Sequence, residues 1–275
     1  MRINTNVSAL RAQRAMSEHN NKIESASGKI SSGSRVRNAS DDAASLSIGT
    51  KQKSNIRSQH QAIRNANDAI GEFQVAEGAM SEIGNILVRL KELSIQSASD
   101  HLQDSERGMA NMEYMQLRKE AERIAQSTKL NGVNLLQNKS GNTRDFMIGI
   151  NNDSNSKMSL KGTELGVSEF NLSIIDSNIS SVTDARLNIG YIDSAIETLA
   201  SKRATAGAYQ NKAQSAISNL EQTNVNESDA MSRTMDADMA YEVSEKMRSE
   251  GKLQAATSVL AQSSQFSAMT LKLLE

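Results

Sequence analysis

The sequence predicts a mainly α-helical protein, a long antiparallel helical bundle or coiled coil that carries a short β-hairpin region. None of the 275 residues is proline, the residue that most strongly interrupts helices. Apolar residues recur every seven positions over long stretches, which is the spacing of helices that pack along their length. Between about residues 130 and 180 this spacing is lost and glycine, asparagine and serine become frequent, which favours turns and short strands.

A first helix is predicted to begin near Asn4 or Asn6, either of which suits the N-cap position, and to end near Gly33. Its apolar stripe is formed by Ala9, Met16, Ile23 and Ile30, with Val7 and Leu10 widening it. Residues 31–44 have the small and polar composition of a loop. This loop closes with three residues that suit the cap and first turn of the next helix, Ser40, Asp41 and Asp42.

A long helix is predicted next, ending near Ser97 and extending over roughly 75 Å at 1.5 Å per residue. One heptad position is assigned to Ile56, Ile63 and Ile70, and the other to Ala66, Phe73, Met80 and Leu87. A break at residues 99–105 offers Asp100 and Asp104 as candidate caps. A shorter helix, marked by Ala110, Tyr114, Leu117, Ala121 and Ile124, then folds back on the long one.

The region from Leu130 to about Ser180 is predicted to hold a β-hairpin, with a strand at residues 144–150 and a turn near residues 151–156. Helix then returns. Ile192, Leu199, Ala206, Ala213 and Leu220 hold one heptad position, and Ile189, Ile196 and Ile217 hold the companion position, which Arg203 and Gln210 interrupt. This order of elements brings the N-terminal and C-terminal halves alongside each other.

The two ends of the chain, residues 1–30 and 250–275, are apolar at helical spacing, and past Gly251 the only charged residues are Lys252, Lys272 and Glu275. A helix with one side in water normally fills that side with lysine and glutamate, so we expect neighbours around most of each end. The residues predicted to make these self-assembly contacts are Val7, Leu10, Met16, Ile23, Leu253, Val259, Leu260, Phe266 and Leu273. Contacts between different faces that do not close into a ring generate a helical polymer.

Each end is predicted to be largely unfolded in the free monomer. The backbone entropy lost on ordering such a segment exceeds what its few apolar side chains return when the segment is alone. We therefore expect both ends to become helical only when neighbouring subunits surround them.

Composition excludes several classes of function. The absence of cysteine removes disulfides, thiolate metal sites and a cysteine nucleophile. A formal net charge of -1, with 31 basic and 32 acidic residues well mixed, gives no footprint for nucleic acid or anionic lipid. We expect no nucleic-acid partner and no membrane insertion, since no apolar run approaches a membrane span and the first residues lack the apolar core of a secretory signal.

No catalytic, cofactor-binding or metal site is predicted, and the protein is not expected to be an enzyme. His19, His60 and His101 each lack a second ligand at matching spacing, so a metal or catalytic role is a minor alternative to ordinary helix positions. Asp41 and Asp42 are better explained as helix caps than as an acid and base pair. Asn151, Asp153 and Asn155 alternate like calcium ligands, but the required glycine and glutamate are absent, so a turn is predicted. Lys29, Arg35 and Arg37 form a basic cluster that fits a solvated loop or a contact to acidic residues of a neighbour.

Several long motifs, occurring in order along the chain, resemble those of bacterial flagellin. They are MRINTNVSALRAQRAM at the start, SSGSRVRNASDDAA from Ser31, RNANDAI from Arg64, RLKELSIQSAS from Arg89, LNGVNLL from Leu130 and SVLAQSSQ from Ser258. The resemblance covers about residues 1–137 and 185–275. Only about fifty residues separate these flanks, so the chain resembles a small flagellin that lacks large outer domains.

The resemblance implies an extracellular structural subunit that polymerises into the bacterial flagellar filament used for swimming and is exported without a cleaved signal peptide. It implies residues 1–41 and 235–275 as paired terminal helices forming the filament core, and residues 42–234 as a helical bundle with a β-hairpin region at about residues 138–180. A hook-filament junction or adaptor protein of the same apparatus is the alternative. An enzyme is a more remote one.

The resemblance also implies partners. These are further copies of the chain, sister flagellins, an export chaperone, and the hook-junction and cap proteins, with no cofactor. In flagellins detected by the animal toll-like receptor for flagellin, the recognition motif falls here on Arg89, Leu93 and Glu113. These three are the candidate receptor contact, although the same residues also suit ordinary exposed or packing positions of a bundle.

Overall fold

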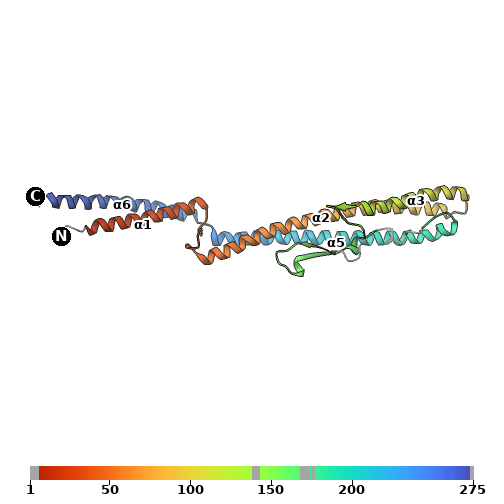
Figure 1. The fold of residues 1–275 in the computed structure, drawn as a ribbon, viewed down its shortest axis with the longest axis horizontal. Helices are drawn as coiled ribbons and strands as arrows, with labels where there is room; N and C mark the ends of the chain where they lie inside the picture. Colours follow the sequence, from red (N-terminus) through yellow and green to blue (C-terminus); the bar gives the residue numbers. More distant parts are fainter. Residues whose placement is uncertain (1–5, 138–142, 168–173, 175–176, 273–275) are drawn as a thin grey trace. The chain divides into compact units, whose positions relative to one another are not determined.

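The computed structural model of the chain describes residues 6–137, 143–167, 174 and 177–272, with side chains to residue 265 (Figure 1). Its elements, in order, are α1 Val7–Ser32, α2 Ala43–Ser97, α3 Asp104–Ser127, β1 Lys129–Leu130, β2 Val133–Asn134, β3 Thr143–Met147, the 3-10 helix η1 Ser154–Ser156, β4 Lys157–Lys161, α4 Gly162–Leu165, α5 Val182–Met235 and α6 Met239–Lys272. The predicted mainly helical fold is confirmed.

The chain forms two compact units. Unit 1 contains residues 1–56 and 225–275, and unit 2 contains residues 57–224. The domain limits expected from the sequence, 41/42 and 234/235, lie instead near the start of α2 and the end of α5. That division concerns the role of the terminal helices in a polymer and stays a prediction.

The ends of α1 and the start of α2 follow the predicted capping chemistry. The Asn6 side chain accepts a hydrogen bond from the backbone N–H of Ala9 at 3.0 Å, which makes Asn6 the N-cap. Gly33 ends α1 in the left-handed region at φ 68°, and its N–H donates to the Lys29 carbonyl at 2.8 Å. At the start of α2 the Asp42 carboxylate accepts from the Ser45 N–H at 3.0 Å.

The caps predicted for α3 are wrong. Its N-cap is Gln103, whose backbone N–H donates to the Glu106 carboxylate at 3.0 Å. Asp104 lies one position later, in the first turn, where a negative charge still favours the helix dipole. Asp100 instead forms an ion pair with Arg186 of α5 at 3.1 Å.

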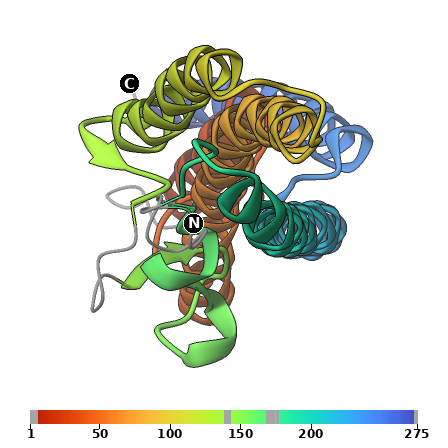
Figure 2. The ribbon, with the colours of Figure 1, turned by 90° about the vertical axis from the view of Figure 1, so that its right-hand side faces the viewer.

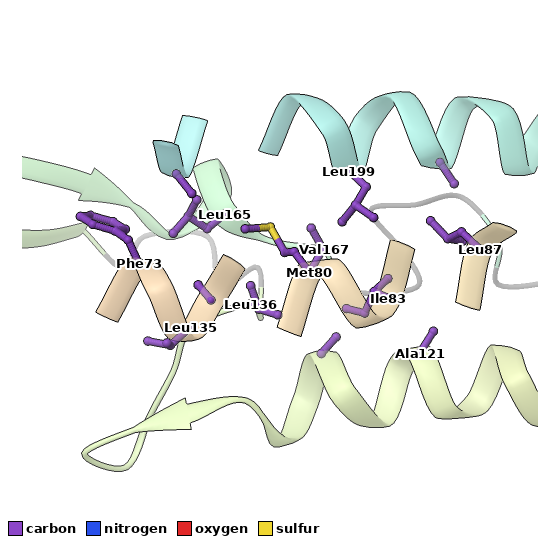
Figure 3. Close-up of a cluster of buried hydrophobic side chains, with 14 of the residues drawn as sticks. Phe73, Met80, Ile83, Leu87, Ala121, Leu135, Leu136, Leu165, Val167 and Leu199 are labelled. Atoms are coloured by element: carbon purple, nitrogen blue, oxygen red, sulfur yellow. The ribbon is translucent and has the colours of Figure 1, made fainter. Parts of the chain in front are cut away.

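The core of unit 2 lies where α2 packs between α3 and α5 (Figures 2 and 3). Ala66, Phe73, Met80 and Leu87 are all fully buried, which confirms this heptad position. The companion position of α2 is one residue away from the predicted one, because Ala62, Ala69, Ala76, Ile83 and Leu90 are buried while Ile56, Ile63 and Ile70 are only partly buried. Small alanines let α2 approach its neighbours closely, and the larger isoleucines flank the contact.

The companion position of α5 differs in the same way. Ile192, Leu199, Ala206 and Ala213 are buried and Leu220 is partly buried, as predicted. Asn188 and Ala195 are buried in place of Ile189 and Ile196, which are partly buried, whereas Ile217 is buried. Arg203 and Gln210, the predicted interruptions, both reach Glu77 of α2, at 3.6 and 3.4 Å. They therefore border the core with polar contacts to the neighbouring helix.

The predicted β-hairpin is present. β3 and β4 pair antiparallel from Thr143 with Lys161 to Met147 with Lys157. The connection includes η1, and the Asp153 carboxylate accepts from the Ser156 N–H at 2.7 Å, which accounts for this aspartate as a turn residue. A second, very short pair, β1 with β2, turns through Asn131 and Gly132, both at positive φ, and was not predicted. Parts of the predicted 138–180 region, residues 138–142, 168–173 and 175–176, lie outside the described residues.

The hairpin is held to the bundle by aromatic side chains. The ring of Phe73 on α2 lies 5.8 Å from that of Phe146 on β3 and 5.6 Å from that of Tyr209 on α5. The Tyr209 hydroxyl donates to Glu164 at 2.6 Å, and burial together with this carboxylate raises the pKa of Tyr209 to about 12. Arg144 of β3 forms an ion pair with Glu72 of α2. Phe73 is thus the residue at which helix and hairpin meet.

Replacing Phe73 by alanine is expected to leave a cavity between α2, α5 and the hairpin. The free energy of unfolding should fall by about 3–5 kcal/mol, measured by chemical denaturation of the full chain. The control is Val75→Ala on the same helix, where the side chain is 42% exposed and the expected change is within about 0.5 kcal/mol. Equal losses in both variants would contradict the assignment of Phe73 to the core.

Candidate assembly interface

α1 and α6 lie side by side and antiparallel in unit 1 (Figure 1). The start of α1 meets the far part of α6, where the hydroxyls of Ser8 and Ser263 lie 2.9 Å apart. The end of α1 meets the start of α6, where Lys29 donates to Glu242 at 3.1 Å. The predicted pairing of the terminal helices is therefore present within one chain.

The seam between these two helices is made of small and polar side chains. Within residues 7–32 and 239–265, the buried residues are Ala12 and Ala26 on α1 and Glu242 and Ser249 on α6. No large apolar side chain of this described part is buried. Small side chains allow the two helix axes to approach closely, but they remove little apolar surface from water.

The large apolar side chains of the pair are exposed or only partly buried. Val7, Leu10 and Val259 are 43%, 56% and 52% exposed. Met16, Ile23, Leu253 and Leu260 are partly buried. Of the other predicted assembly residues, the side chain of Phe266 and the whole of Leu273 lie outside the described residues. The structure thus leaves Val7, Leu10 and Val259 of the predicted surface largely uncovered in the single chain.

Four exposed apolar residues near the start of α6 extend this surface and were not predicted. They are Met239, Tyr241, Val243 and Met247, of which Met247 is 68% exposed. Met239, Val243 and Met247 are spaced by four, which is the helical signal that could have found them. The sequence interpretation limited the apolar end to residues 250–275 and so missed them.

A shallow groove of about 460 Å³ lies on the α1–α6 pair. It is lined by Val7, Ser8, Arg11, Ala12, Ala15, Ala256 and Val259. Its lining comes from both helices and includes two of the exposed apolar residues. A side chain from another molecule could therefore enter between the helices at this point.

Polar contacts join the chain segments where α1 and α6 begin to pair. The backbone N–H of Arg35 donates to the Met235 carbonyl at 2.7 Å, and that of Ala237 donates to the Gly33 carbonyl at 2.9 Å. The Arg35 guanidinium also donates to the Thr234 carbonyl at 2.7 Å. Two members of the predicted basic cluster, Lys29 and Arg35, are thus engaged within the chain.

Arg37, the third member, crosses α1 at Gly28. A β-carbon at position 28 would meet the Arg37 guanidinium, so the missing side chain of the glycine makes room for it. Its path across the backbone therefore depends on glycine at this position.

The structure brings Arg89 and Glu113 together but buries Leu93. The Arg89 guanidinium donates to Glu92 at 2.9 Å and to Glu113 at 2.9 Å, and these hydrogen bonds to the two carboxylates raise the pKa of Arg89 above its usual value. Both partners are exposed, whereas Leu93 is 2% exposed and belongs to the core of unit 2. Leu93 therefore packs inside the bundle next to an accessible ion pair.

Among the described residues, no three His, Cys, Asp or Glu side chains are grouped so that they could hold a metal ion. None of the helices in the described ranges has the length and apolar character needed to cross a bilayer.

Comparisons with known proteins match almost the whole chain. The family model of the bacterial flagellin N-terminal helical region matches residues 3–141, and that of the bacterial flagellin C-terminal helical region matches residues 189–274. The chain is 35% identical over 274 residues to a flagellin of Halalkalibacterium halodurans and 33% identical over 284 residues to the flagellar filament 30.7 kDa core protein of Treponema maltophilum, with 100% of both chains covered in each case. The crystal structure of Bacillus cereus flagellin superposes with a TM-score of 0.51 at 25% identity, covering 57% of this chain and 88% of that one.

Enlarging the seam is expected to weaken self-association. Ala26→Leu should push α1 away from α6 at a cost of about 1–3 kcal/mol, which raises the concentration needed for polymerisation roughly 5- to 150-fold. Sedimentation measures the fraction of the protein that is polymerised as the total protein concentration is varied. Ala26→Ser keeps the small volume and should stay close to the wild type. A similar loss with serine would show that size is not what the seam requires.

Proposed function

This chain belongs to the bacterial flagellin family and is a structural subunit of the flagellar filament used for swimming, and from that premise we propose that α1 and α6 form the surface through which it polymerises. The residues are Val7, Leu10, Met16, Ile23, Leu253, Val259, Leu260, Phe266 and Leu273, extended by Met239, Tyr241, Val243 and Met247.

One observation carries this proposal: in the α1–α6 pair the buried positions hold small or polar side chains, whereas large apolar ones such as Leu10, Val259 and Met247 are exposed. In unit 2 the arrangement is the reverse, with Phe73, Met80 and Leu87 buried. A helix pair that leaves Leu10 and Met247 in water has not reached its most stable environment. Contact with other subunits would supply the missing cover.

The scarcity of charged residues in the C-terminal part of α6 also supports an assembly role for this part of the surface. Ion pairs of the terminal helices are few and mostly local, such as Glu18 with Lys22 and Lys246 with Glu250. Beyond Gly251 the charged residues are Lys252, Lys272 and Glu275. A long stretch of α6 can therefore enter an apolar interface without burying a charge, which would otherwise cost several kcal/mol per unpaired ion.

We further propose that assembly is controlled by folding of the ends. The seam of small side chains returns little free energy for the backbone entropy that helix formation costs. The ends would then be largely unfolded in the free monomer and become helical between neighbours. An unfolded end also suits export through a narrow channel without a cleaved signal peptide.

Partners other than further copies of the chain are inferred from membership of the flagellin family. We propose an export chaperone for the C-terminal segment, hook-junction and cap proteins at the filament ends, and sister flagellins as copolymerising subunits. The relatives are named as flagellins and filament core proteins. None of these names favours the alternative of a junction or adaptor protein.

Recognition by the animal toll-like receptor for flagellin is a further proposal, with altered roles for the three residues. Arg89 and Glu113 present an exposed ion pair that a receptor could contact. Leu93, being buried, would act by supporting α2 beneath that pair.

Removing either end is expected to abolish polymerisation and leave the bundle folded. Chains lacking residues 1–30 or residues 250–275 should stay helical by circular dichroism, because the core of unit 2 lies within residues 57–224. Electron microscopy should show no filaments at concentrations at which the full chain forms them. Filaments from either truncated chain would overturn the proposal.

Placing a charge on the outer surface is expected to block assembly in the intact chain. Val259→Glu would bury an unpaired carboxylate in the interface, and we expect at least a hundredfold rise in the concentration needed for polymerisation, since leaving such a charge unpaired costs about 3–5 kcal/mol. The melting temperature of the bundle should not change.

The matched control is Gln262→Glu, an exposed polar position on the same helix. It adds the same charge without removing an apolar side chain, and a smaller effect is expected. Normal assembly of Val259→Glu would remove this residue from the interface. A lower melting temperature would instead assign Val259 to the core of the monomer.

A further inference from the structure

We propose that two polar contacts, Lys29 with Glu242 and Ser263 with Asn6 and Ser8, determine which face of α6 packs on α1. The inference rests on the proposed function, because the orientation of α6 decides which side chains are offered to neighbouring subunits. Lys29 and Glu242 are thus positioning residues for self-assembly.

The apolar side chains of α6 select a face only weakly, because Leu253 and Leu260 are partly buried and the fully buried positions hold Glu242 and Ser249. Around the middle of this helix the sequence runs Ala255, Ala256, Thr257 and Ser258, which are all small. Ala256 is partly buried and the other three are exposed. At this point of the helix, turning α6 by one residue would exchange one small side chain for another.

Polar contacts do distinguish the faces at the near end of the pair. Lys29 donates to Glu242 at 3.1 Å, and the two side chains are 26% and 7% exposed. Lys29 lies in the last turn of α1 and Glu242 in the first turn of α6, so the dipole of its own helix also stabilises each charge. If α6 were turned, Lys29 and Glu242 would be separated, and each charge would lose its ion-pair partner.

A second contact distinguishes the faces at the far end. The Asn6 amide donates to the Ser263 carbonyl at 3.1 Å, and the Ser263 hydroxyl donates to the Asn6 side-chain oxygen at 3.0 Å. The hydroxyl of Ser8 lies 2.9 Å from that of Ser263.

The two contacts lie on one stripe of each helix. Lys29 comes three heptads after Ser8, and Ser263 comes three heptads after Glu242. Between them on α6, at the same heptad position, lie Ser249 and Ala256. A polar residue at such a position is known to specify register and pairing in coiled coils, whether or not it adds stability.

The backbone bonds near Gly33 and Arg35 do not replace these contacts. They join residues 33–35 to residues 235–237, which lie at or beyond the helix ends. Such bonds fix the position of α1 and α6 relative to each other along the helix axis. They lie outside the paired helices, so we assign the outward direction of Val243, Met247 and Val259 to the side-chain contacts between α1 and α6.

Engineered disulfides can report the orientation of α6 because the chain has no cysteine of its own. Ala15 and Ala256 line the same groove, so A15C/A256C reports the orientation in the structure. Ala255 is exposed, and A15C/A255C reports an α6 turned by one residue. The measurement is the ratio of the two disulfide yields in filaments after mild oxidation.

Charge reversal should turn α6. In Lys29→Glu two carboxylates face each other, and in Glu242→Lys two ammonium groups do. We expect each change to lower the ratio of native to turned disulfide at least about tenfold, which corresponds to 1.4 kcal/mol. The double variant Lys29→Glu/Glu242→Lys should restore most of the ratio, although both charges then oppose the helix dipoles.

The control for charge reversal is Glu250→Lys. Glu250 pairs with Lys246 on the surface of α6 and has no contact with α1 among the described interactions, so the ratio should stay at the wild-type value. If a single reversal prevents filament formation, recovery of filaments in the double variant replaces the ratio as the readout, and Glu242→Gln should still assemble.

Three results would overturn the inference. They are an unchanged ratio in both single variants, failure of the double variant to restore the ratio or the filaments, and an equal effect of Glu250→Lys. Failure of the proposed function is a separate outcome, because the wild-type chain and Glu250→Lys would then also form no filaments.

Discussion

The placement of large and small side chains on the terminal helix pair is the constraint on which the rest of the structure depends. α1 and α6 approach through Ala12 and Ala26, so their contact buries little apolar surface. Leu10, Val259 and Met247 are left outside. Under the proposed function, contacts with neighbouring subunits would cover these side chains, and polymerisation would follow from packing.

The second unit shows what the same kind of helix does when its large residues face inward. Phe73, Met80 and Leu87 of α2 lie in the buried cluster of this unit (Figure 3), and charged contacts such as that of Glu77 with Arg203 lie along its border. Its stability comes from within the chain. One sequence therefore contains a unit with a core of its own and a unit whose apolar surface is left for other molecules.

The sequence predicted what depends on local chemistry and on one strong period. The limits of α1 followed from Asn6 and Gly33, and the buried heptad of α2 followed from large residues such as Phe73. The companion heptads were missed because alanines, which carry a weak apolar signal, occupy the closest contacts, and isoleucines beside them carry a strong one. The burial of Leu93 and the pairing of Lys29 with Glu242 depend on helices distant in sequence, so no local pattern reveals them.

The use of methionine on the outer face of α6 has a chemical consequence. Met239 and Met247 are 46% and 68% exposed, and their unbranched thioethers can adapt to an irregular neighbouring surface. In a protein without cysteine, peroxide attack on sulfur is confined to methionine. Sulfoxide formation would make this face polar before a subunit is incorporated, whereas subunits already covered by neighbours are shielded from the oxidant.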